Sequence, residues 1–213
     1  MKKIDYYFDF LSPYSYFSLI NLENSNFFEQ YDVALKPVVM GSLFNHFEMK
    51  GPGEILPKRH YMLKQCFIYS AQNNIPFNPP NDHPFNPLYA LRLATKACSG
   101  DKQLEIVKLL FRSCWEKGLT LGEPEDLEPI LDAHSFNAKE MIDKTFEREV
   151  KKELKQNVKD AIASNVFGVP SFVVDDNLFW GNDSISNLLN YVKGDFVTWN
   201  EDLYNFKIAQ DIL

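Results

Sequence analysis

The stretch FDFLSPYSY, residues 8–16, decides the fold because it joins a predicted strand to a predicted helix. Residues 4–10 form a short, aromatic-rich run that is typical of a buried strand. Ser12 is a favourable N-cap residue, and Pro13 suits the first position of a helix. Ser12 and Ser15 have the spacing of a Cys-x-x-Cys pair but cannot form a disulfide. Sulfur chemistry at this helix start therefore needs a bound thiol; the alternative is that Ser12-Pro13 only begins a helix.

A second segment far along the chain, FGVPSFVV at residues 167–174, predicts a strand that begins with a proline. Proline is tolerated at the first residue of a strand, where no ladder N–H is required. The alternative is an ordinary trans Val169-Pro170 bond in a loop, since trans is the usual state of X-Pro bonds. Residues 175–177 form a turn-type cluster between two short apolar runs, which predicts a hairpin. Residues 181–184 begin a final helix.

Together these segments resemble the 2-hydroxychromene-2-carboxylate isomerases and the kappa-class glutathione transferases, which belong to the DsbA-like branch of the thioredoxin superfamily. The matching text lies at residues 7–16, 83–92, 167–172 and 179–183, so its order and spacing extend over nearly the whole chain. The resemblance implies an α/β, thioredoxin-like fold of the DsbA-like type. It also implies that Pro170 is cis and faces the helix start, and that the N–H of Val169 pairs with an extended thiol peptide such as glutathione.

The sequence between the two segments predicts a large helical insertion. Residues 33–40 fit a second strand, parallel to the first through a right-handed crossover. We predict a discontinuous thioredoxin-like domain at residues 1–41 and 166–213, with an inserted helical domain at residues 42–165; residues 194–213 form a C-terminal extension. The predicted helices of the insertion cover residues 61–72, 87–98, 101–116, 124–134 and 138–164. The last of these has a single apolar stripe, with lysines and glutamates on its other faces.

The composition excludes several classes of protein. The 213 residues are 45% hydrophobic, which is ample for a core, and the net charge of −7 argues against a nucleic-acid surface. No run of eighteen apolar residues exists, so we predict no membrane span. Three widely spaced cysteines, Cys66, Cys98 and Cys114, favour a reducing, cytoplasmic setting. The four histidines are scattered and form no ligand pair, so we predict no metal site.

Ser12 is the predicted catalytic residue. A thiol is a poor nucleophile until it is ionised, and a helix N-terminus favours an anion. The Ser12 hydroxyl can donate a hydrogen bond to a bound thiolate, and charge-assisted hydrogen bonds are the stronger kind. We expect the backbone N–H groups around Tyr14 and Ser15 to assist at the same helix start.

The resemblance implies further glutathione contacts. Asn182 and Asp183 match the positions that hold the glutamyl end, and we expect Asp183 to pair with its amino group; the alternative is that Asp183 is a plain N-cap. Lys58 is the nearest match to a lysine of the family, and Arg59 is the alternative. Asn86 either faces the substrate or fixes the Asn-Pro turn.

The chain also departs from the family at three positions. An Asp and an Arg usually follow on the two helical turns after the residue matched by Tyr61, and here these places hold Gln65 and Ile68. The Arg that commonly follows the Asn-Asp pair is replaced by Ser184. An anionic aromatic pyruvate needs cationic partners for its carboxylate. These losses therefore weigh against a naphthalene-type substrate more than against the glutathione site.

The predicted function is cis-trans isomerisation of a 2-hydroxychromene-2-carboxylate-type compound, with the thiolate of glutathione as a borrowed nucleophile. One alternative is a kappa-type glutathione transferase that acts on another electrophile. A third hypothesis, from another class, is a protein that only binds a thiol peptide. A disulfide oxidoreductase is disfavoured because positions 12 and 15 are both serine. We expect a cytoplasmic homodimer whose partners are glutathione and a small aromatic or electrophilic substrate.

Overall fold

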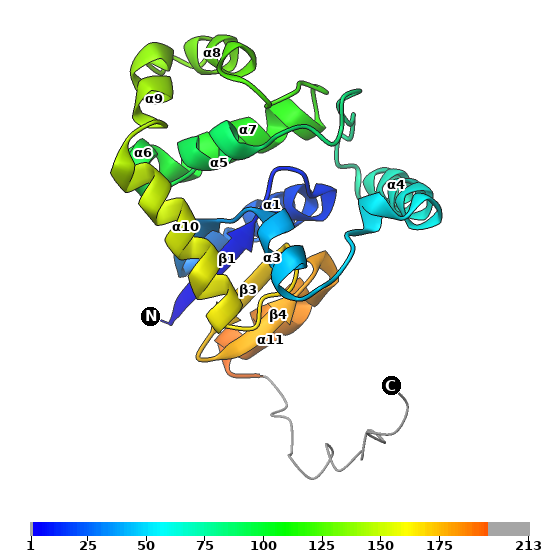
Figure 1. Cartoon of the computed structure of the whole chain (residues 1–213). Coiled ribbons are helices and arrows are strands. Elements are labelled where there is room, and N and C mark those ends of the chain that lie inside the picture. Colours follow the sequence, from blue (N-terminus) through cyan, green and yellow to red (C-terminus); the bar gives the residue numbers. More distant parts are fainter. Residues whose placement is uncertain (1, 196–213) are drawn as a thin grey trace.

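The computed structural model describes residues 2–195, and its centre is a four-stranded sheet of order β2-β1-β3-β4 (Figure 1). β1 (Lys3–Phe8) pairs in parallel with β2 (Asp32–Pro37) and antiparallel with β3 (Ser171–Val174). β4 (Asn177–Trp180) pairs antiparallel with β3. The strands that the sequence predicts at both ends of the chain therefore meet in one sheet, as a thioredoxin-like fold requires.

Helices make up most of the remaining structure. In chain order they are α1 (Pro13–Asn24), α2 (Phe27–Gln30), α3 (Met40–His46), the 3-10 helix η1 (Pro52–Glu54), α4 (Leu56–Asn73), α5 (Leu88–Leu93), α6 (Lys96–Ser99), the 3-10 helix η2 (Gly100–Lys102), α7 (Gln103–Trp115), α8 (Pro124–Asp132), α9 (Ala138–Lys144), α10 (Arg148–Ala163), the 3-10 helix η3 (Asn182–Ser184) and α11 (Ile185–Lys193).

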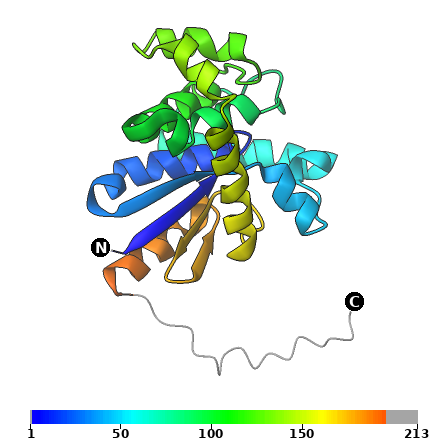
Figure 2. The same ribbon diagram turned by 60° about the vertical axis from the view of Figure 1, so that its left-hand side comes forward.

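The alternation of side chains along β1 explains why both faces of the sheet are covered. Ile4, Tyr6 and Phe8 point into the main apolar cluster, which also contains residues of α1, α7 and α11. Tyr7 points to the other face and joins a smaller cluster with residues of α3 and α10. Tyr6 stacks on Phe172 of β3 with ring centroids 4.8 Å apart, which ties the two central strands together. Figures 1 and 2 show α10 crossing the second face, with α4 at the periphery of the molecule.

The helical insertion packs directly on the sheet layer. The main apolar cluster contains residues from both the predicted thioredoxin-like part and the predicted insertion. The indole Nε1 of Trp115 in α7 donates a hydrogen bond of 3.0 Å to the carbonyl of Phe10. The insertion thus contacts the end of β1 where the site was predicted, while the domain boundaries at residues 41 and 166 stay predictions.

Two of the predicted helices are each divided in two. Residues 138–164 form α9 and α10, and residues 87–98 form α5 and α6. At the first break the Thr145 hydroxyl donates to the Ile142 carbonyl at 2.7 Å, and Phe146 is 49% exposed instead of lying on the apolar stripe. At the second break Thr95 caps α6 by accepting the Cys98 N–H. Both single-helix predictions were wrong because threonine side chains bind backbone groups locally and interrupt the helix.

The hairpin between β3 and β4 is confirmed. Asp175 and Asp176, at its turn, both have positive φ angles of 47° and 62°. Two central residues of positive φ are typical of the tight turns that match the twist of a hairpin. The predicted extension at residues 194–213 lies almost entirely outside the described residues. Within residues 2–195 no helix is both long and apolar enough to cross a membrane.

Candidate active site

Ser12 joins the two segments that the sequence singles out. Its hydroxyl caps α1 by accepting the Ser15 N–H at 3.2 Å, and it donates to the carbonyl of Val169 at 3.2 Å. Ser12 is only 5% exposed. The predicted helix start and the predicted proline segment, 157 positions apart in the chain, are therefore in direct contact.

The Val169–Pro170 bond is cis, as predicted. The segment around it is held on both sides: Ser171 Oγ donates to the Gly168 carbonyl at 2.7 Å, and the Gly181 N–H donates to the Pro170 carbonyl at 2.9 Å. A Cβ at Gly168 would lie 2.9 Å from the indole nitrogen of Trp180, so the indole lies against this backbone. Any larger residue at this position would force the indole to shift.

Two backbone N–H groups at this junction have no acceptor among residues 2–195. They belong to Val169 and to Tyr14, which lies in the first turn of α1. The carbonyl of Val169 accepts the Ser12 hydroxyl, and Tyr14 follows Ser12 by two residues at a helix N-terminus, where an anion is favoured. The junction therefore offers donors for an incoming anionic or peptide-like group.

The Ser12 hydroxyl makes a weak hydrogen bond in this arrangement. Its 3.2 Å separation from the Val169 oxygen is longer than the usual O–H···O distance of about 2.7–2.8 Å. A bound thiolate would compete for this hydrogen, because a hydrogen bond to an anion is stronger than one to a neutral carbonyl. The geometry thus allows the hydroxyl to turn from the carbonyl toward a ligand.

Ser15 differs from the expectation drawn from its sequence position. Its N–H is occupied, because it donates to the hydroxyl and carbonyl oxygens of Ser12. Its side chain is fully buried, and its Oγ has no partner in the part of the chain that the structure describes. Buried hydroxyls are normally hydrogen-bonded. At the second position of the Cys-x-x-Cys spacing, the free donor is therefore the hydroxyl of Ser15 and not its N–H.

A cavity of about 400 Å³ opens beside Tyr14. Its lining consists of Tyr14, Pro52, Pro57, Lys58, Tyr61 and Met62. Burial, then the neighbouring Cys66, Tyr61 and Asp183, raise the pKa of Tyr14 to about 12. The phenol thus lies where α1, α4 and η3 converge, and the structure brings the predicted residues Tyr14, Lys58 and Asp183 to one region.

The two candidate cations on α4 have different surroundings. Lys58 is exposed and lines the cavity beside Tyr14. Arg59 instead donates from Nη2 to the carbonyl of His83 at 3.2 Å. Of the two candidates, Lys58 therefore lines the cavity, whereas Arg59 binds the backbone of His83.

The Asn182-Asp183 pair begins the last helical segment next to the site. Asn182 Oδ1 accepts a hydrogen bond of 2.8 Å from Asn21 Nδ2, which also donates to the Tyr69 hydroxyl at 2.7 Å. This network ties η3 to α1 and α4. Asp183 is exposed and makes no side-chain cap for either η3 or α11 within the described residues. Its carboxylate lies against Gly181, whose φ of +95° suits glycine.

Asn86 adopts the geometry of the turn-fixing alternative. Its Oδ1 accepts the N–H of Leu88 at 3.2 Å, at the start of α5, and its side chain is exposed. A role of Asn86 toward the substrate stays a prediction.

Sequence reasoning missed two residues that contact the segment before Ser12. Asp9 accepts the Leu11 N–H at 3.0 Å and the Met40 N–H at 2.8 Å. His83 Nε2 lies 3.0 Å from the Leu11 carbonyl. Burial raises the pKa of Asp9 to about 6, although its hydrogen bonds from the Leu11 and Met40 N–H groups partly offset this effect. Burial lowers the pKa of the His83 ring. The available signals were the position of Asp9 inside the quoted stretch and of His83 inside residues 83–92.

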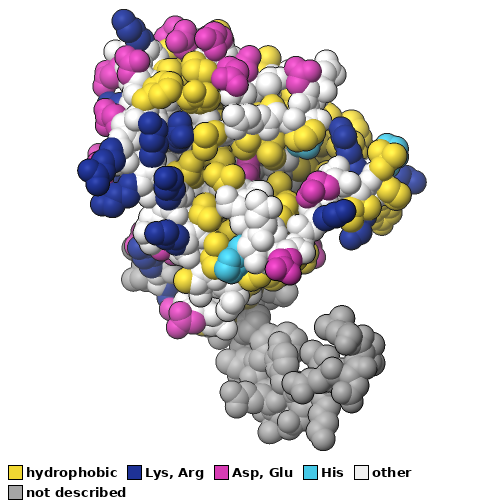
Figure 3. Space-filling view, in the orientation of Figure 1, with side chains coloured by type: hydrophobic (Ala, Val, Ile, Leu, Met, Phe, Trp, Pro, Cys, Tyr) yellow, Lys and Arg dark blue, Asp and Glu magenta, His cyan; other side chains and the backbone are white. Residues whose placement is uncertain are grey.

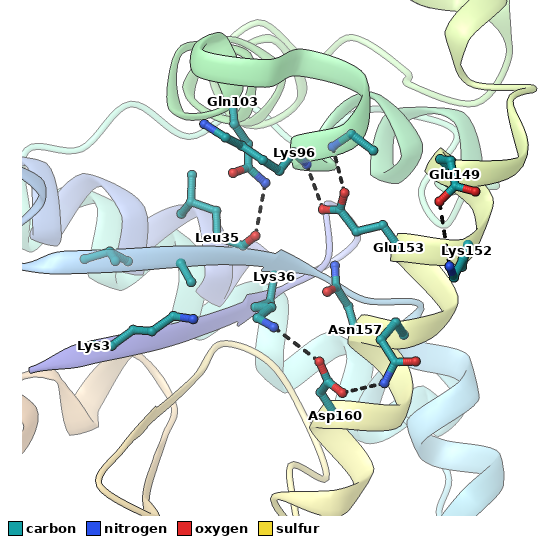
Figure 4. A pocket seen from close by; sticks show the side chains of 14 residues that line it. Lys3, Leu35, Lys36, Lys96, Gln103, Glu149, Lys152, Glu153, Asn157 and Asp160 are labelled. Carbon is teal, nitrogen blue, oxygen red and sulfur yellow. Dashed lines mark hydrogen bonds and ion pairs between the residues drawn. The ribbon is translucent and has the colours of Figure 1, made fainter.

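A second cavity, of about 620 Å³, lies elsewhere, between β2, α6 and α10 (Figure 4). Most of its polar groups already have partners. Lys36 pairs with Asp160 at 3.2 Å, and Gln103 donates to the Leu35 carbonyl at 3.0 Å. Lys and Arg side chains gather on the α10 side of the molecule, whereas hydrophobic side chains gather in the hollow centre of the same face (Figure 3). None of the predicted site residues lines the groove between β2, α6 and α10, whereas Tyr14 and Lys58 line the cavity at α1 and α4, so we do not place the active site in that groove. No group of three His, Cys, Asp or Glu side chains within residues 2–195 is arranged to hold a metal ion.

The sheet, the capped start of α1 and the proline that precedes β3 define a thioredoxin-fold protein without cysteines at the redox positions. More particularly, the chain belongs to the family of the DSBA-like thioredoxin domain, whose model matches residues 3–193.

Named relatives of the chain are enzymes. It is 25% identical over 210 residues to glutathione S-transferase kappa 2 of Caenorhabditis elegans, covering 92% of this chain and 93% of the relative. It is 24% identical over 194 residues to 2-hydroxychromene-2-carboxylate isomerase of Sphingobium xenophagum, covering 90% and 98%.

Solved structures share the fold. The chain superposes on a 2-hydroxychromene-2-carboxylate isomerase with a TM-score of 0.79 and 18% identity, covering 90% of this chain and 94% of that one. It also superposes on the cytosolic disulfide reductase DsbM of Pseudomonas aeruginosa with GSH, with a TM-score of 0.61 and 14% identity, covering 90% and 99%. At these identities the structures support the fold alone.

Proposed function

We propose that this protein is a glutathione-dependent enzyme whose leading activity is the isomerisation of a 2-hydroxychromene-2-carboxylate-type compound. The observation that carries the proposal is the contact of Ser12 with Val169, beside the unpaired N–H groups of Tyr14 and Val169 and the unpaired Ser15 hydroxyl. A relative named as a glutathione S-transferase and a structural neighbour with GSH support the choice of thiol.

The residues present fit a bound thiol peptide. Val169 offers its N–H to the peptide backbone, and Ser12 and the N-terminus of α1 lie where a thiolate is stabilised. Lys58 offers a cation for a carboxylate of glutathione, and the exposed Asp183 offers an anion for its amino group. When bound, glutathione supplies a thiolate that adds reversibly to a conjugated carbonyl compound and is regenerated on elimination.

The role of Ser12 in this reaction is to hold the sulfur as an anion. Its O–H turns from the Val169 carbonyl to the thiolate, while its Oγ keeps accepting the Ser15 N–H. The same hydroxyl stabilises the thiolate again when it leaves. The positive end of α1 adds to this effect without any movement, because the helix is already capped and begins at Pro13.

A second candidate is a kappa-type glutathione transferase that acts on another electrophile. The observation that favours it is the lining of the cavity beside Tyr14, where Lys58 is the one cationic residue among those described. Gln65, Ile68 and Ser184 stand where the family offers charged groups. If Lys58 binds glutathione, an anionic substrate has no further cation in this cavity, whereas a neutral electrophile needs none.

The decisive experiment is calorimetric titration with reduced glutathione, followed by turnover assays with a panel of conjugated carbonyl compounds and other electrophiles. We expect glutathione to bind, and dithiothreitol not to replace it in turnover. Binding without turnover of any electrophile would support the third hypothesis, a thiol-peptide binding protein. Full activity after complete removal of glutathione would exclude the mechanism.

We also propose that the protein is a cytoplasmic homodimer. The three cysteines are free and buried, in keeping with the reducing setting that the sequence favours. Light scattering at two protein concentrations tests the dimer, and fractionation of the native cells tests the compartment.

A further inference from the structure

The peptide of Leu11, immediately before Ser12, is held by side chains on both of its polar groups. Its N–H donates to Asp9 Oδ1 at 3.0 Å, and its carbonyl lies 3.0 Å from His83 Nε2. The preceding carbonyl, of Phe10, accepts the Trp115 indole N–H at 3.0 Å. Residues 10 and 11 lie between β1 and α1, where no strand or helix satisfies their backbone groups. Three side chains bind three of these groups instead: Asp9 from two residues away, and His83 and Trp115 from distant positions.

We propose that His83 and Asp9 are positioning residues that clamp the Leu11 peptide and thereby fix the Ser12 hydroxyl for thiolate stabilisation. This inference rests on the proposed function. The Ser12 N–H donates to the Asp9 carbonyl at 3.0 Å, so the clamp and the start of α1 share one turn of chain. A loose Leu11 peptide would let Ser12 shift relative to Val169, and a hydrogen bond already 3.2 Å long tolerates little shift.

Each half of the clamp is anchored to a different part of the molecule. Asp9 Oδ2 accepts the N–H of Met40, the first residue of α3, at 2.8 Å. The carbonyl of His83 accepts Arg59 Nη2 at 3.2 Å, and its ring packs on Trp115 with centroids 5.3 Å apart. Arg59 is the sequence neighbour of Lys58, which lines the cavity beside Tyr14. His83 therefore connects the helix that carries Lys58 to the loop that carries Ser12.

The hydrogen bond assigns the protonation of His83. A carbonyl oxygen only accepts, so Nε2 carries the hydrogen. Both the neutral ring of this tautomer and the charged ring carry that hydrogen, and burial, which lowers the pKa of His83, favours the neutral one. A side chain that cannot donate at this point leaves the Leu11 carbonyl without its partner.

The test compares His83→Phe, which removes the donor, with His83→Gln, which keeps an N–H donor at a similar reach. The matched control is His134→Phe. His134 follows the end of α8, and its Nδ1 makes the same type of contact, 2.9 Å from the carbonyl of Ile130 in that helix. We expect His83→Phe to raise the pKa of bound glutathione in a thiolate absorbance titration and to lower kcat about tenfold, the scale of one lost hydrogen bond. KM for the electrophile should stay unchanged. His83→Gln should recover most of both losses, and His134→Phe should change neither.

A second measurement does not need glutathione. Hydrogen exchange of the amides of residues 10–15 should accelerate about tenfold in His83→Phe, relative to the control, in the ligand-free protein. Unchanged exchange in His83→Phe would overturn the clamp, whether or not the wild-type protein binds glutathione. Failure of the wild-type protein to bind glutathione would refute the proposed function but not the clamp. An unchanged thiol pKa in a variant that still binds glutathione would also overturn it. If His83→Phe does not fold, Arg59→Leu is the substitute, because it removes the hydrogen bond from the half-exposed Arg59 to the His83 carbonyl. We expect it to accelerate amide exchange of residues 10–15 about threefold.

Discussion

The groove between β2 and α10 and the junction at Ser12 differ in the state of their polar groups. In the larger groove, Glu153 binds the N–H groups of Lys96 and Ala97, each at 2.7 Å. The Asn157 amide donates to the Pro37 carbonyl at 3.2 Å, next to the Gln103 contact with Leu35. At the smaller junction the N–H groups of Tyr14 and Val169 and the Ser15 hydroxyl have no partner within residues 2–195.

The difference shows that a larger cavity need not contain more unsatisfied polar groups. The side chains of Gln103 and Asn157 cover outward carbonyls of the edge strand β2, which removes hydrogen-bonding groups that another strand would need. This groove is polar and already satisfied, so a ligand would have to replace existing bonds. The junction at Ser12 has donors without acceptors within residues 2–195, and under the proposed function the bound thiol peptide would supply those acceptors.

The largest expected effect concerns Asp9, a buried carboxylate that has no cationic partner within residues 2–195, compared with Asp160 of the groove, which pairs with Lys36. The pKa of Asp9 is about 6 in the folded protein against 3.8 for the free side chain, so the folded state binds more protons between these values. The stabilisation from protonated Asp9 is present below about pH 4 and is lost as pH rises through about 6. We expect the difference in unfolding free energy between wild type and Asp9→Asn to fall by about 2.5 kcal/mol from pH 4 to 7.

Urea unfolding at several pH values measures this difference. Asp160→Asn is the control, since an ion pair at the surface contributes less than about 1 kcal/mol. If the unfolding free energies of wild type and Asp9→Asn differ by the same amount at every pH, the pKa of Asp9 is not raised in the folded state.

Ser12→Ala is expected to have the next largest effect, at the junction. Loss of the hydroxyl should raise the pKa of bound glutathione and destabilise the thiolate by about 2 kcal/mol, within the range for a hydrogen bond to a charged group. Part of any loss in stability comes from the missing cap of α1. Thiolate absorbance and urea unfolding separate the two effects, with the exposed Ser186→Ala as control. An unchanged thiolate titration would show that Ser12 is only structural.

Asn157→Leu should affect the groove alone. The substitution leaves the Pro37 carbonyl without its buried donor, which costs about 1 to 2 kcal/mol of stability. Glutathione binding and turnover should match the wild type. Gln156→Leu, at an exposed neighbouring position, is the control for stability. A loss of glutathione affinity in Asn157→Leu would contradict the separation of the two regions.

Asp183→Ala is expected to have the smallest effect. Asp183 is exposed, so its pairing with the amino group of glutathione contributes at most about 1 kcal/mol, or about fivefold in Kd. The melting temperature of the Asp183→Ala protein should equal that of the wild type, because Asp183 caps no helix in the described structure. Calorimetry tests the affinity, with the exposed Glu128→Ala as control. Undiminished affinity would mean that the glutamyl end is held elsewhere.

The sequence was sufficient for the features that depend on local chemistry. Ser12-Pro13 predicts the start of α1, and Gly168-Val169-Pro170 predicts the entry to β3, because caps and prolines act within a few residues. The breaks at Thr95 and Thr145 were missed because apolar periodicity continues across them, while the hydroxyls that interrupt the helices carry no periodic signal.

The contacts of Leu11 were missed for a different reason. His83 is 72 positions from Leu11, and their contact depends on how the insertion folds back on β1. A lone histidine in a sequence does not reveal its acceptor. Asp9 lies at the end of an apolar strand, where its burial depends on the N–H of Met40 being brought to it by the fold.

The close approach of Trp180 to Gly168 gives the protein an optical reporter on the segment that leads to Pro170. The indole is 53% exposed, packs on Phe167 with ring centroids 4.9 Å apart, and lies against the backbone that leads to Val169. Trp115 is fully buried and donates a hydrogen bond to the Phe10 carbonyl, in the other segment, which leads from β1 to Ser12. The two fluorophores therefore differ in emission wavelength and in access to quenchers. In a Trp199→Phe background, each reports separately on one of the two chain segments that meet at Ser12.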